Sequence, residues 1–252
     1  MQLNQLGPCK IVIPSHKRHD KVETLKLLPN AIICVEYKQL EAYKEYNPDN
    51  EIVTHPNTVI GLPAKRNWMV KHFGELFMID DDIYGFRKLY VKPHEPNQIK
   101  EEEEIVNKIQ ALYHIAKMLG VSLFKFNRKP HPLHYDAFKP FTLSTSITGC
   151  AYGAINGPNM VWDETLKVKE DYYISSVIKY YERKVLVDNR YNFAQKDTFV
   201  NSGGLSGTRT QEAEEEAALK LRKLFGECIT LKQNQKLSKT KHKFQTTTTY
   251  NF

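Results

Sequence analysis

Short apolar runs alternate with segments of helical spacing along the N-terminal third of the chain. Uninterrupted apolar runs of this length are typical of buried strands, and they occupy residues 9–13, 31–37 and 76–79, with a further strand predicted at 51–56. Segments with helical spacing lie between them, at residues 21–29, 41–47 and 62–73. Alternating strands and helices form a mainly parallel sheet with right-handed crossovers. The pattern therefore predicts an α/β protein with a mainly parallel central sheet and flanking helices.

The alternation continues toward the C-terminus. Helices are predicted at residues 101–119, 169–184 and 210–226, and strands at residues 121–126, 144–155 and 185–193. A long loop with three prolines separates two of the strands at residues 127–141, and residues 201–209 form a glycine-rich loop. We expect one domain over residues 1–228 and a basic, flexible tail over residues 229–252, because the tail lacks apolar periodicity.

Three consecutive carboxylates, Asp80–Asp82, follow the strand predicted at residues 76–79. They cannot continue into the core, because adjacent like charges are costly in a low dielectric. In an extended segment the first and third point the same way, and their hard oxygens suit a Mg²⁺ or Mn²⁺ ion that also holds substrate phosphates. Ligands of open α/β sheets bind at the carboxyl ends of strands. This context favours a metal site over the alternative, a solvated turn, and predicts that Ser15–Lys21 and Glu36 converge on the same place.

Two basic clusters flank the acidic strand end, His16–His19 after the first strand and Lys65–Asn67 at the start of a helix. A divalent cation, basic side chains and a helix N-terminus together suit a diphosphate. Each cluster by itself is also compatible with a solvated surface patch. The chain contains no GxxxxGK[ST] motif, and no GxGxxG follows the first strand. These absences exclude a P-loop NTPase and argue against a dinucleotide-binding site.

Glu170 and Asp171 begin a later predicted helix. Acids at this position commonly interact with the helix dipole or cap the helix. The alternative is a general base that removes a proton from an acceptor hydroxyl. That alternative gains weight if the pair lies near a metal-bound diphosphate.

The chain is basic, with a formal net charge of +7 over 252 residues. Excess positive charge favours polyanions such as nucleic acid, nucleotides or an anionic membrane. Between Lys220 and Lys243 there are eight lysines or arginines and one acid, Glu227. This segment adds to the case for a nucleic-acid partner.

The four cysteines are far apart and form no CxxC pair, which argues against a zinc knuckle and a disulfide scaffold. We see neither a signal peptide nor an apolar run of membrane-spanning length. We therefore expect a soluble cytoplasmic protein with no membrane partner, in the host cytoplasm if the chain is encoded by a phage.

Four motifs occur in the order found in GT-A glycosyltransferases: IVIPSHKR, GLPAKRN, LFMIDDD and the later Glu-Asp pair. They resemble the nucleotide-binding strand, the Arg-Asn helix, the DxD metal motif and the xED motif of that class, over about residues 9–180. The IPSHKR opening and the Gly-Gly loop also resemble the phage TET-associated glycosyltransferase group, whose members are implied to add sugars to hydroxymethylated pyrimidines in DNA. The resemblance implies a single GT-A, Rossmann-like domain.

The resemblance also implies roles for individual residues. Asp80 and Asp82 would hold the Mn²⁺ or Mg²⁺ ion, and Asp171, with Glu170, would serve catalysis as the base of an inverting reaction. The residues implied to bind the nucleotide sugar are Pro14, Ser15, His16, Arg18, Glu36, Lys65, Arg66, Asp80 and Asp81. Many GT-A enzymes add a late histidine to the metal shell, but the only histidine after Asp171 is His242, in the basic tail. The third protein ligand of the metal therefore stays open.

Together these observations predict a metal-dependent glycosyltransferase, hexosyl- or pentosyl-transferring, that uses a UDP-sugar. Modified duplex DNA is the predicted acceptor. The alternatives are the same chemistry on a glycan, lipid or protein, and an inactive glycosyltransferase-like module that binds DNA. A nucleotidyltransferase also uses strand-end aspartates, but it would release pyrophosphate.

Overall fold

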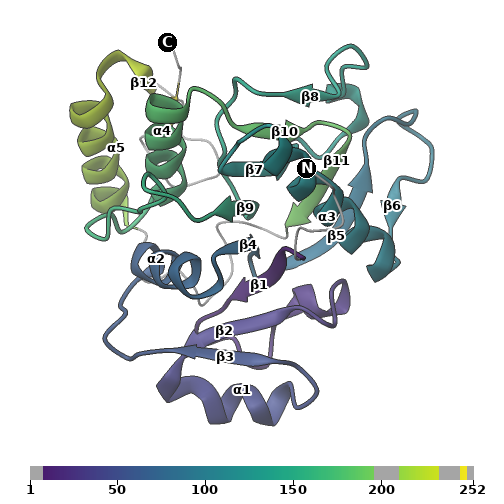
Figure 1. Ribbon diagram of the computed structural model, residues 1–252, viewed down its shortest axis with the longest axis vertical. Helices are drawn as coiled ribbons and strands as arrows, with labels where there is room; N and C mark the ends of the chain where they lie inside the picture. Colours follow the sequence, from purple (N-terminus) through teal and green to yellow (C-terminus); the bar gives the residue numbers. More distant parts are fainter. Residues whose placement is uncertain (1–7, 196–209, 233–244, 249–252) are drawn as a thin grey trace.

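The structure is a computed structural model that describes residues 8–195, 210–232 and 245–248. Figure 1 shows a mixed α/β arrangement with helices packed around a central sheet. The sheet has eight strands in the order β3-β2-β1-β4-β9-β7-β10-β8. Their bounds are β1 Lys10–Pro14, β2 Ile32–Glu36, β3 Ile52–His55, β4 Glu75–Ile79, β7 Leu123–Phe126, β8 Phe141–Thr142, β9 Ala151–Ile155 and β10 Leu186–Asp188.

Most of the strands in this sheet run in one direction. β1 is parallel to both β2 and β4, β2 is parallel to β3, and β7 is parallel to β10. β9 runs antiparallel between β4 and β7, and β8 is an antiparallel addition beside β10. The predicted fold class is therefore confirmed. Since β4 and β7 are both antiparallel to β9, the strands β1, β2, β4 and β7 all end at the same edge.

Within the described residues, five helices, a second sheet and a two-stranded third sheet accompany the central sheet. The helices are α1 Leu40–Tyr46, α2 Leu62–Phe73, α3 Glu102–Met118, α4 Glu170–Glu182 and α5 Gln211–Phe225. Short 3₁₀ turns are η2 Glu23–Lys26, η3 Tyr37–Gln39, η4 Pro132–His134 and η5 Gly226–Cys228. The second sheet consists of β5 Ile83–Lys88, β6 Gln98–Ile99 and β11 Tyr191–Gln195, in the order β11-β5-β6.

Alternation along β4 divides the core between the two faces of the central sheet. Phe77 and Ile79 belong to the cluster that contains α3 and the second sheet, whereas Leu76 and Met78 belong to the cluster that contains α2 and α4. All four side chains are at most 2% exposed. Because both faces are covered, this strand is an uninterrupted apolar run, as the sequence predicted.

Gly153 in β9 is fixed by a close contact with its neighbouring strand. It pairs with Phe124 of β7, and a Cβ atom at this position would lie 2.0 Å from the Phe124 ring. That separation is far inside van der Waals contact, so any side chain here would displace the phenylalanine. Glycine at position 153 is therefore a packing requirement of this strand.

Three predicted elements differ from the structure. The helix predicted at residues 21–29 is only the turn η2, and the strand predicted at 144–155 is regular only over β9. The strand predicted at 185–193 divides into β10 and β11, which belong to different sheets. The chain turns between them at Asn189 and Arg190, where Arg190 Nε and Nη2 donate to the Asp188 carboxylate at 2.9 and 2.8 Å.

The predicted tail also contains regular structure. β12 Ile229–Lys232 pairs antiparallel with β13 Gln245–Thr248, and Ile229 is buried against α5. Both strands lie within the segment predicted as a basic, flexible tail, whose residues 233–244 and 249–252 lie outside the described part. Among the described residues, no helix is both long and apolar enough to cross a membrane.

Candidate functional site

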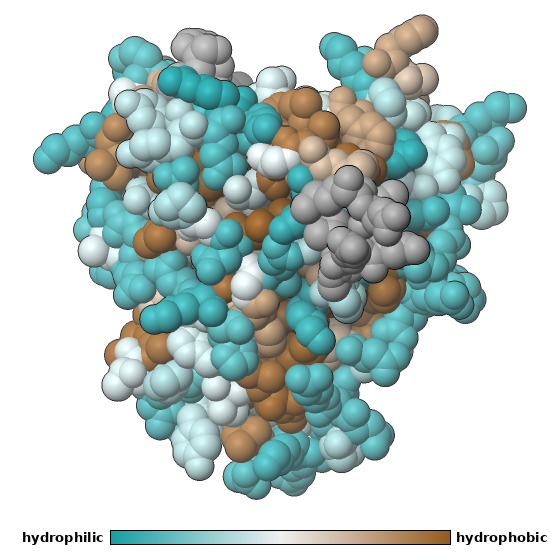
Figure 2. Space-filling view, in the orientation of Figure 1, coloured by the Kyte–Doolittle hydropathy of each residue, from teal (hydrophilic) through white to brown (hydrophobic). Residues whose placement is uncertain are grey.

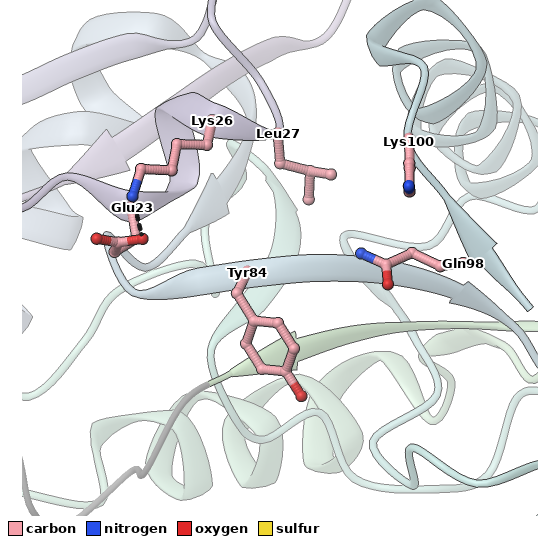
Figure 3. Close-up of a pocket in the computed structure, with 6 residues that line it drawn as sticks. All are labelled: Glu23, Lys26, Leu27, Tyr84, Gln98 and Lys100. Atoms are coloured by element: carbon pink, nitrogen blue, oxygen red, sulfur yellow. Dashed lines mark hydrogen bonds and ion pairs between the residues drawn. The ribbon is translucent and has the colours of Figure 1, made fainter.

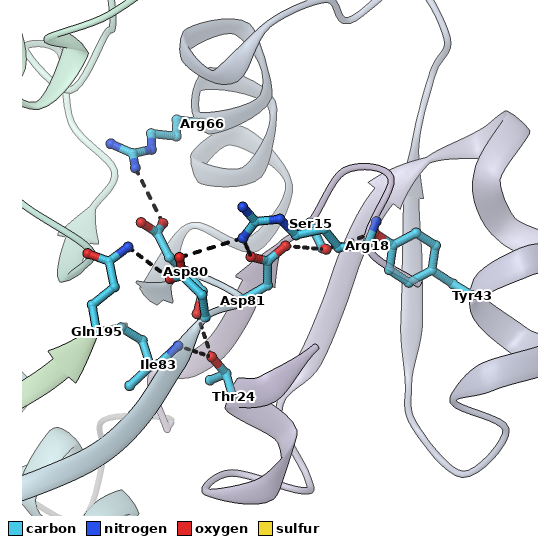
Figure 4. Close-up of polar contacts among 10 residues, drawn as sticks. Ser15, Arg18, Thr24, Tyr43, Arg66, Asp80, Asp81, Ile83 and Gln195 are labelled. Atoms are coloured by element: carbon cyan, nitrogen blue, oxygen red, sulfur yellow. Dashed lines mark hydrogen bonds and ion pairs between the residues drawn. The ribbon is translucent and has the colours of Figure 1, made fainter. Parts of the chain in front are cut away.

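The predicted polar residues meet at the carboxyl edge of the central sheet. Ser15 directly follows β1, Glu36 ends β2 and Asp80 directly follows β4. Because these three parallel strands are neighbours about 4.8 Å apart, residues distant in sequence become adjacent here. The predicted convergence is confirmed, and Figure 4 shows its central part.

Asp81 points into the protein and joins β4 to the loop after β1. Its Oδ2 accepts from Ser15 Oγ at 2.5 Å, and its Oδ1 accepts from Arg18 Nη1 at 2.6 Å (Figure 4). Ser15 Oγ lies 2.7 Å from the Tyr43 hydroxyl, which donates to it because the serine proton is directed at Asp81. Burial raises the pKa of Asp81, while the Ser15 and Arg18 contacts oppose that rise. Both carboxylate oxygens are therefore engaged within the protein, an arrangement that positions the loop.

Asp80 and Asp82 flank Asp81 in the turn after β4 and have other partners, although Asp82 also lies near Arg18. The Asp80 side chain is 33% exposed, and its Oδ1 lies 3.9 Å from Arg66 Nη2. Asp82 Oδ1 accepts from Gln195 Nε2 at 2.8 Å, and Asp82 Oδ2 lies 3.6 Å from Arg18 Nη1. Limited solvent contact raises the pKa of Asp80, and Asp82 and Asp81 add to the rise while Arg66 opposes it. The turn thus presents concentrated negative charge at the sheet edge.

The backbone of this turn is held by Thr24. Its Oγ1 donates to the Asp80 carbonyl at 2.6 Å and accepts from the Ile83 N–H at 3.0 Å. The Asp80 N–H donates to the Cys150 carbonyl at 2.8 Å. The aspartates are therefore fixed from both sides, although the helix predicted around Thr24 is only one turn.

A divalent cation fits this turn in part. Two carboxylates in i, i+2 positions supply hard oxygen ligands, and a cation would relieve their mutual repulsion. Within the described ranges, however, no group of three or more His, Cys, Asp or Glu side chains is arranged to hold a metal ion. Asp80 and Asp82 could therefore hold a cation only if phosphate oxygens and water completed its shell.

Arg66 connects the aspartate turn to helix α4. Its Nη1 lies 3.0 Å from Glu170 Oε1 and donates to the Tyr152 hydroxyl, and its guanidinium lies 4.9 Å from the Tyr152 ring centroid. The Arg66 and Glu170 side chains are 3% and 8% exposed. Burial opposes the charge of Arg66, but Tyr152 and Glu170 outweigh it and raise the pKa. Arg66 and Glu170 are thus a buried pair, which makes Glu170 a partner of Arg66 and leaves Asp171 as the candidate base.

Lys65 ties helix α2 to the end of β1. Its Nζ donates to the Ser15 carbonyl at 2.8 Å, and the side chain is buried. Burial lowers the pKa of this lysine.

Helix α2 begins after Gly61, whose φ of 87° favours glycine. Pro63 lies in the first turn of the helix, where a missing N–H is tolerated.

The nucleoside side of the predicted site contains Pro14, His16 and Glu36. Pro14 ends β1, and Gln39 Nε2 lies 2.9 Å from His16 Nδ1 and 3.2 Å from Glu36 Oε2. Burial disfavours the ionised form of Glu36, but contacts with Lys38 and Gln39 outweigh it and lower the pKa. Burial and nearby Lys65 lower the pKa of His16. These side chains lie together, as predicted, with Gln39 between them.

Asp171 is held by two backbone N–H groups. Its Oδ2 accepts from Gly149 at 2.8 Å, and its Oδ1 accepts from Tyr172 at 2.9 Å. The Gly149 N–H belongs to the same peptide unit as the Thr148 carbonyl, which accepts from Lys125 Nζ. Lys125 and Asp171 therefore hydrogen-bond to the carbonyl and the N–H of the same Thr148–Gly149 peptide unit.

Lys125 is the functional candidate that the sequence reasoning missed. It is 4% exposed in the central strand β7. Burial lowers its pKa to about 8, and Cys150, Arg128 and Asp171 are its charged or titratable neighbours. The available signal was a lone lysine inside the apolar segment at residues 121–126. Tyr43, Tyr152 and Gln195 were also missed, since aromatic and amide residues have no distinguishing sequence context here.

A separate shallow pocket of about 220 Å³ lies between η2, β5 and β6 (Figure 3). Glu23, Lys26, Leu27, Tyr84, Gln98 and Lys100 line it. None of the predicted site residues is among them, so the candidate site is defined by its polar contacts.

Comparisons with solved structures find S. aureus TarS. A TarS chain spanning 1–349 has a TM-score of 0.48 and 12% identity, and the same chain in complex with UDP has a TM-score of 0.46 and 12% identity. Each match covers 86% of this chain and 66% of that one. A longer TarS chain, with a TM-score of 0.43 and 12% identity, is covered over 40% of its length. This chain therefore spans less than two thirds of each.

The sequence itself gives a firmer assignment. No curated protein matches it. The family described as TET-Associated Glycosyltransferase matches residues 9–204, which include β1, the aspartate turn, Lys125 and the Glu170-Asp171 pair. Since this match covers most of the chain, the resemblance predicted from the motifs is confirmed, and the protein belongs to the TET-Associated Glycosyltransferase family.

Proposed function

We propose that this glycosyltransferase moves a sugar from a UDP-sugar to a hydroxymethylated pyrimidine in phage DNA, with the help of Mn²⁺ or Mg²⁺. The observation that supports it most is the meeting of Asp80 and Asp82 with Arg18, Arg66 and Asp171 at one sheet edge. This set offers cation ligands, positive charge for phosphates and an acid for an acceptor hydroxyl.

The donor binds along the ends of β1, β2 and β4. Glu36 and His16 face the nucleoside, and Arg18 lies between that region and Asp82. Pro14, Ser15, Lys65 and Asp81 shape this surface through the contacts that fix the loop after β1. Arg66 contributes positive charge beside Asp80 while it stays paired with Glu170. A cation at Asp80 and Asp82 would neutralise the leaving diphosphate.

Asp171 acts as the general base if the reaction inverts. The Gly149 and Tyr172 N–H groups hold its carboxylate in a fixed orientation, and each oxygen keeps a further lone pair for an incoming hydroxyl. General-base catalysis by a positioned carboxylate contributes about a hundredfold or more to a rate.

The assignment of DNA as acceptor is supported by charge. The net charge of +7 and the basic segment Lys220–Lys243 favour a polyanion. Much of that segment, residues 233–244, lies outside the described part. A base inside a duplex must be turned out of the stack, or reached through the major groove, before its hydroxymethyl group meets the donor.

Mass analysis of reaction products tests this function directly. The full chain is incubated with a panel of nucleotide sugars, with and without Mn²⁺, and with duplex DNA that contains 5-hydroxymethylcytosine or 5-hydroxymethyluracil. We expect a hexose or pentose mass increment on the digested modified nucleoside, dependent on the cation. Transfer only to a glycan, lipid or protein would contradict the acceptor, and donor-independent DNA binding with no transfer would indicate an inactive module.

A further inference from the structure

Residues 127–140 form a loop at the same edge of the sheet as the aspartate turn. β7 ends at Phe126, and β4 ends directly before Asp80. Only β9 separates these two parallel strands, so their ends are about 10 Å apart. We call residues 127–140 the edge loop. Its start lies beside the candidate donor site.

The base of the edge loop contacts the group that holds Asp171. Arg128 Nη1 lies 3.3 Å from Thr148 Oγ1, and the next residue, Gly149, donates its N–H to Asp171 at 2.8 Å. The edge loop therefore extends the candidate site outward from Asp171, the candidate general base. A molecule presented to Asp171 would also lie against this loop.

Backbone hydrogen bonds fix both ends of the edge loop. The Asn127 N–H donates to the Asp188 and Tyr191 carbonyls at 3.0 and 2.9 Å. At the other end, Asn189 donates from its side chain to the Lys139 carbonyl at 2.9 Å and from its N–H to the Pro140 carbonyl at 2.8 Å. With its three prolines, the loop has a defined path.

Two large apolar side chains project from this fixed loop into solvent. Phe138 is 96% exposed and Leu133 is 73% exposed. Turn hydrogen bonds hold both: the Phe138 N–H donates to Asp136 Oδ1 at 3.0 Å, and the Leu133 N–H donates to His131 Nδ1 at 3.2 Å. Figure 2 shows hydrophobic side chains protruding at the upper rim of the molecule, above the region labelled β8 in Figure 1. Phenylalanine and leucine are usually buried, and none of the residues that the structure describes covers these two.

The surroundings of the two apolar side chains are basic. The loop carries three exposed cations, Arg128, Lys129 and Lys139, and one acid, Asp136, which lies 3.9 Å from Lys139 Nζ. His131 and His134 are also exposed. A protein-docking face would be a broad apolar patch. Isolated apolar points among cations instead suit a partner with phosphates outside and stacked apolar surfaces inside.

We propose that the edge loop is a duplex-DNA wedge, in which Phe138 and Leu133 enter the base stack beside the target nucleotide while Arg128, Lys129 and Lys139 contact the flanking phosphates. This inference rests on the proposed DNA acceptor. Apolar wedges of this kind unstack a base step and bend the duplex. The two apolar side chains occupy the space that the target nucleotide leaves. The first residues of the edge loop lie next to Asp171, where the hydroxymethyl group must arrive.

The test uses the full chain with Phe138→Ala and a matched control, Met118→Ala. Met118 is 62% exposed and is the last residue of α3. It comes just before the start of β7, whereas the edge loop follows the end of that strand. The duplex contains 5-hydroxymethylcytosine beside 2-aminopurine, whose fluorescence rises on unstacking. We expect Phe138→Ala to weaken duplex affinity about tenfold or more and to abolish the fluorescence rise, with UDP affinity and sugar transfer to the free hydroxymethylated nucleoside unchanged. Met118→Ala should match the parent.

The cationic part of the proposal is tested by salt. Lys129→Gln and Lys139→Gln should each reduce the slope of log affinity against log salt by about 1. If the parent glycosylates duplex DNA and Phe138→Ala matches it in affinity and fluorescence, the wedge is refuted while the proposed function stands. If the parent neither binds nor glycosylates DNA, both are refuted. Phe138-dependent binding to phosphatidylglycerol vesicles without DNA binding would reassign the loop to a membrane.

Discussion

The two sides of the carboxyl edge are built in opposite ways. On the β1–β4 side, charged groups are buried and paired: the Arg18 and Asp81 side chains are 13% and 8% exposed, and those of Arg66 and Glu170 are 3% and 8% exposed. On the β7–β8 side, the edge loop leaves Phe138 and its basic neighbours in solvent. Buried pairs cost desolvation and fix one geometry, which suits a small donor. Exposed groups on a fixed backbone suit a large polymer that brings its own surface.

The largest expected effect follows from breaking a buried pair on the donor side. Arg66→Ala removes the guanidinium that lies 3.0 Å from Glu170, and removing one partner of a buried pair costs about 3–5 kcal/mol of the free energy of unfolding. Urea denaturation measures this loss. Lys26→Ala, which removes an ion pair whose lysine is 76% exposed, should cost less than about 1 kcal/mol. Equal losses in the two variants would contradict the contrast between buried and exposed charge.

Lys125 should give the protein a distinctive pH dependence. Its folded pKa of about 8 lies below its ordinary value of 10.5, so the unfolded chain binds more protons between these values. Stability of the parent should therefore rise with pH across this window, by on the order of 3 kcal/mol from this group. Lys125→Met should lose that rise, whereas Lys71→Met, at an exposed position, should keep it. Parallel pH curves for the parent and Lys125→Met would show that the lysine is not desolvated.

Asp171→Asn tests the candidate base at the boundary between the two sides. We expect turnover to fall about a hundredfold or more, with UDP affinity close to that of the parent, because the amide oxygen can still accept an N–H. Asp163→Asn is a suitable control, since that acid also accepts a backbone N–H, from Thr165 at 3.0 Å. Near-normal turnover of Asp171→Asn would indicate that the acid only holds the loop at Gly149.

Asp82→Asn tests cation-dependent donor binding. The variant should keep the fold, because Gln195 can rotate its amide to bond with asparagine, and should lose about tenfold or more of the Mn²⁺-dependent affinity for UDP, since Asp82 would be a direct cation ligand. Calorimetry with and without Mn²⁺ measures this, and the exposed Asp49→Asn serves as control. UDP affinity that is the same in both variants and indifferent to Mn²⁺ would remove the metal from the proposal.

The smallest expected effect concerns the network that fixes the loop after β1. Ser15→Ala removes one donor from the buried Asp81 carboxylate, which should cost about 1–2 kcal/mol of the free energy of unfolding. The same network positions Arg18, so the donor KM should rise more than turnover falls. Ser144→Ala, at an exposed serine, should change neither. A stable Ser15→Ala variant would mean that Tyr43 takes over the hydrogen bond.

Predictions from the sequence were accurate where local pattern and burial coincide. The strands around residues 9–13, 31–37 and 76–79 follow from uninterrupted apolar runs, and α3 follows from helical spacing with glutamates in its first turn. They were inaccurate where non-local pairing decides. Residues 21–29 form only one turn because Thr24 bonds to the aspartate turn, and 185–193 divides because its two halves pair with different sheets.

The sequence by itself determined that carboxylates stand at the end of a buried strand and that the chain belongs to a glycosyltransferase family. Tertiary structure decided which charges are paired and which are exposed. Asp81 bonds to Ser15, 66 positions away, and Glu170 pairs with Arg66. Lys125 and Asp171 bond to the carbonyl and the N–H of the same peptide unit, whereas Phe138 is exposed among the described residues. The physical reason is that spacing along the chain sets which side of a strand a residue occupies, while the partners and solvent contact of a charge depend on segments that only the folded sheet brings together.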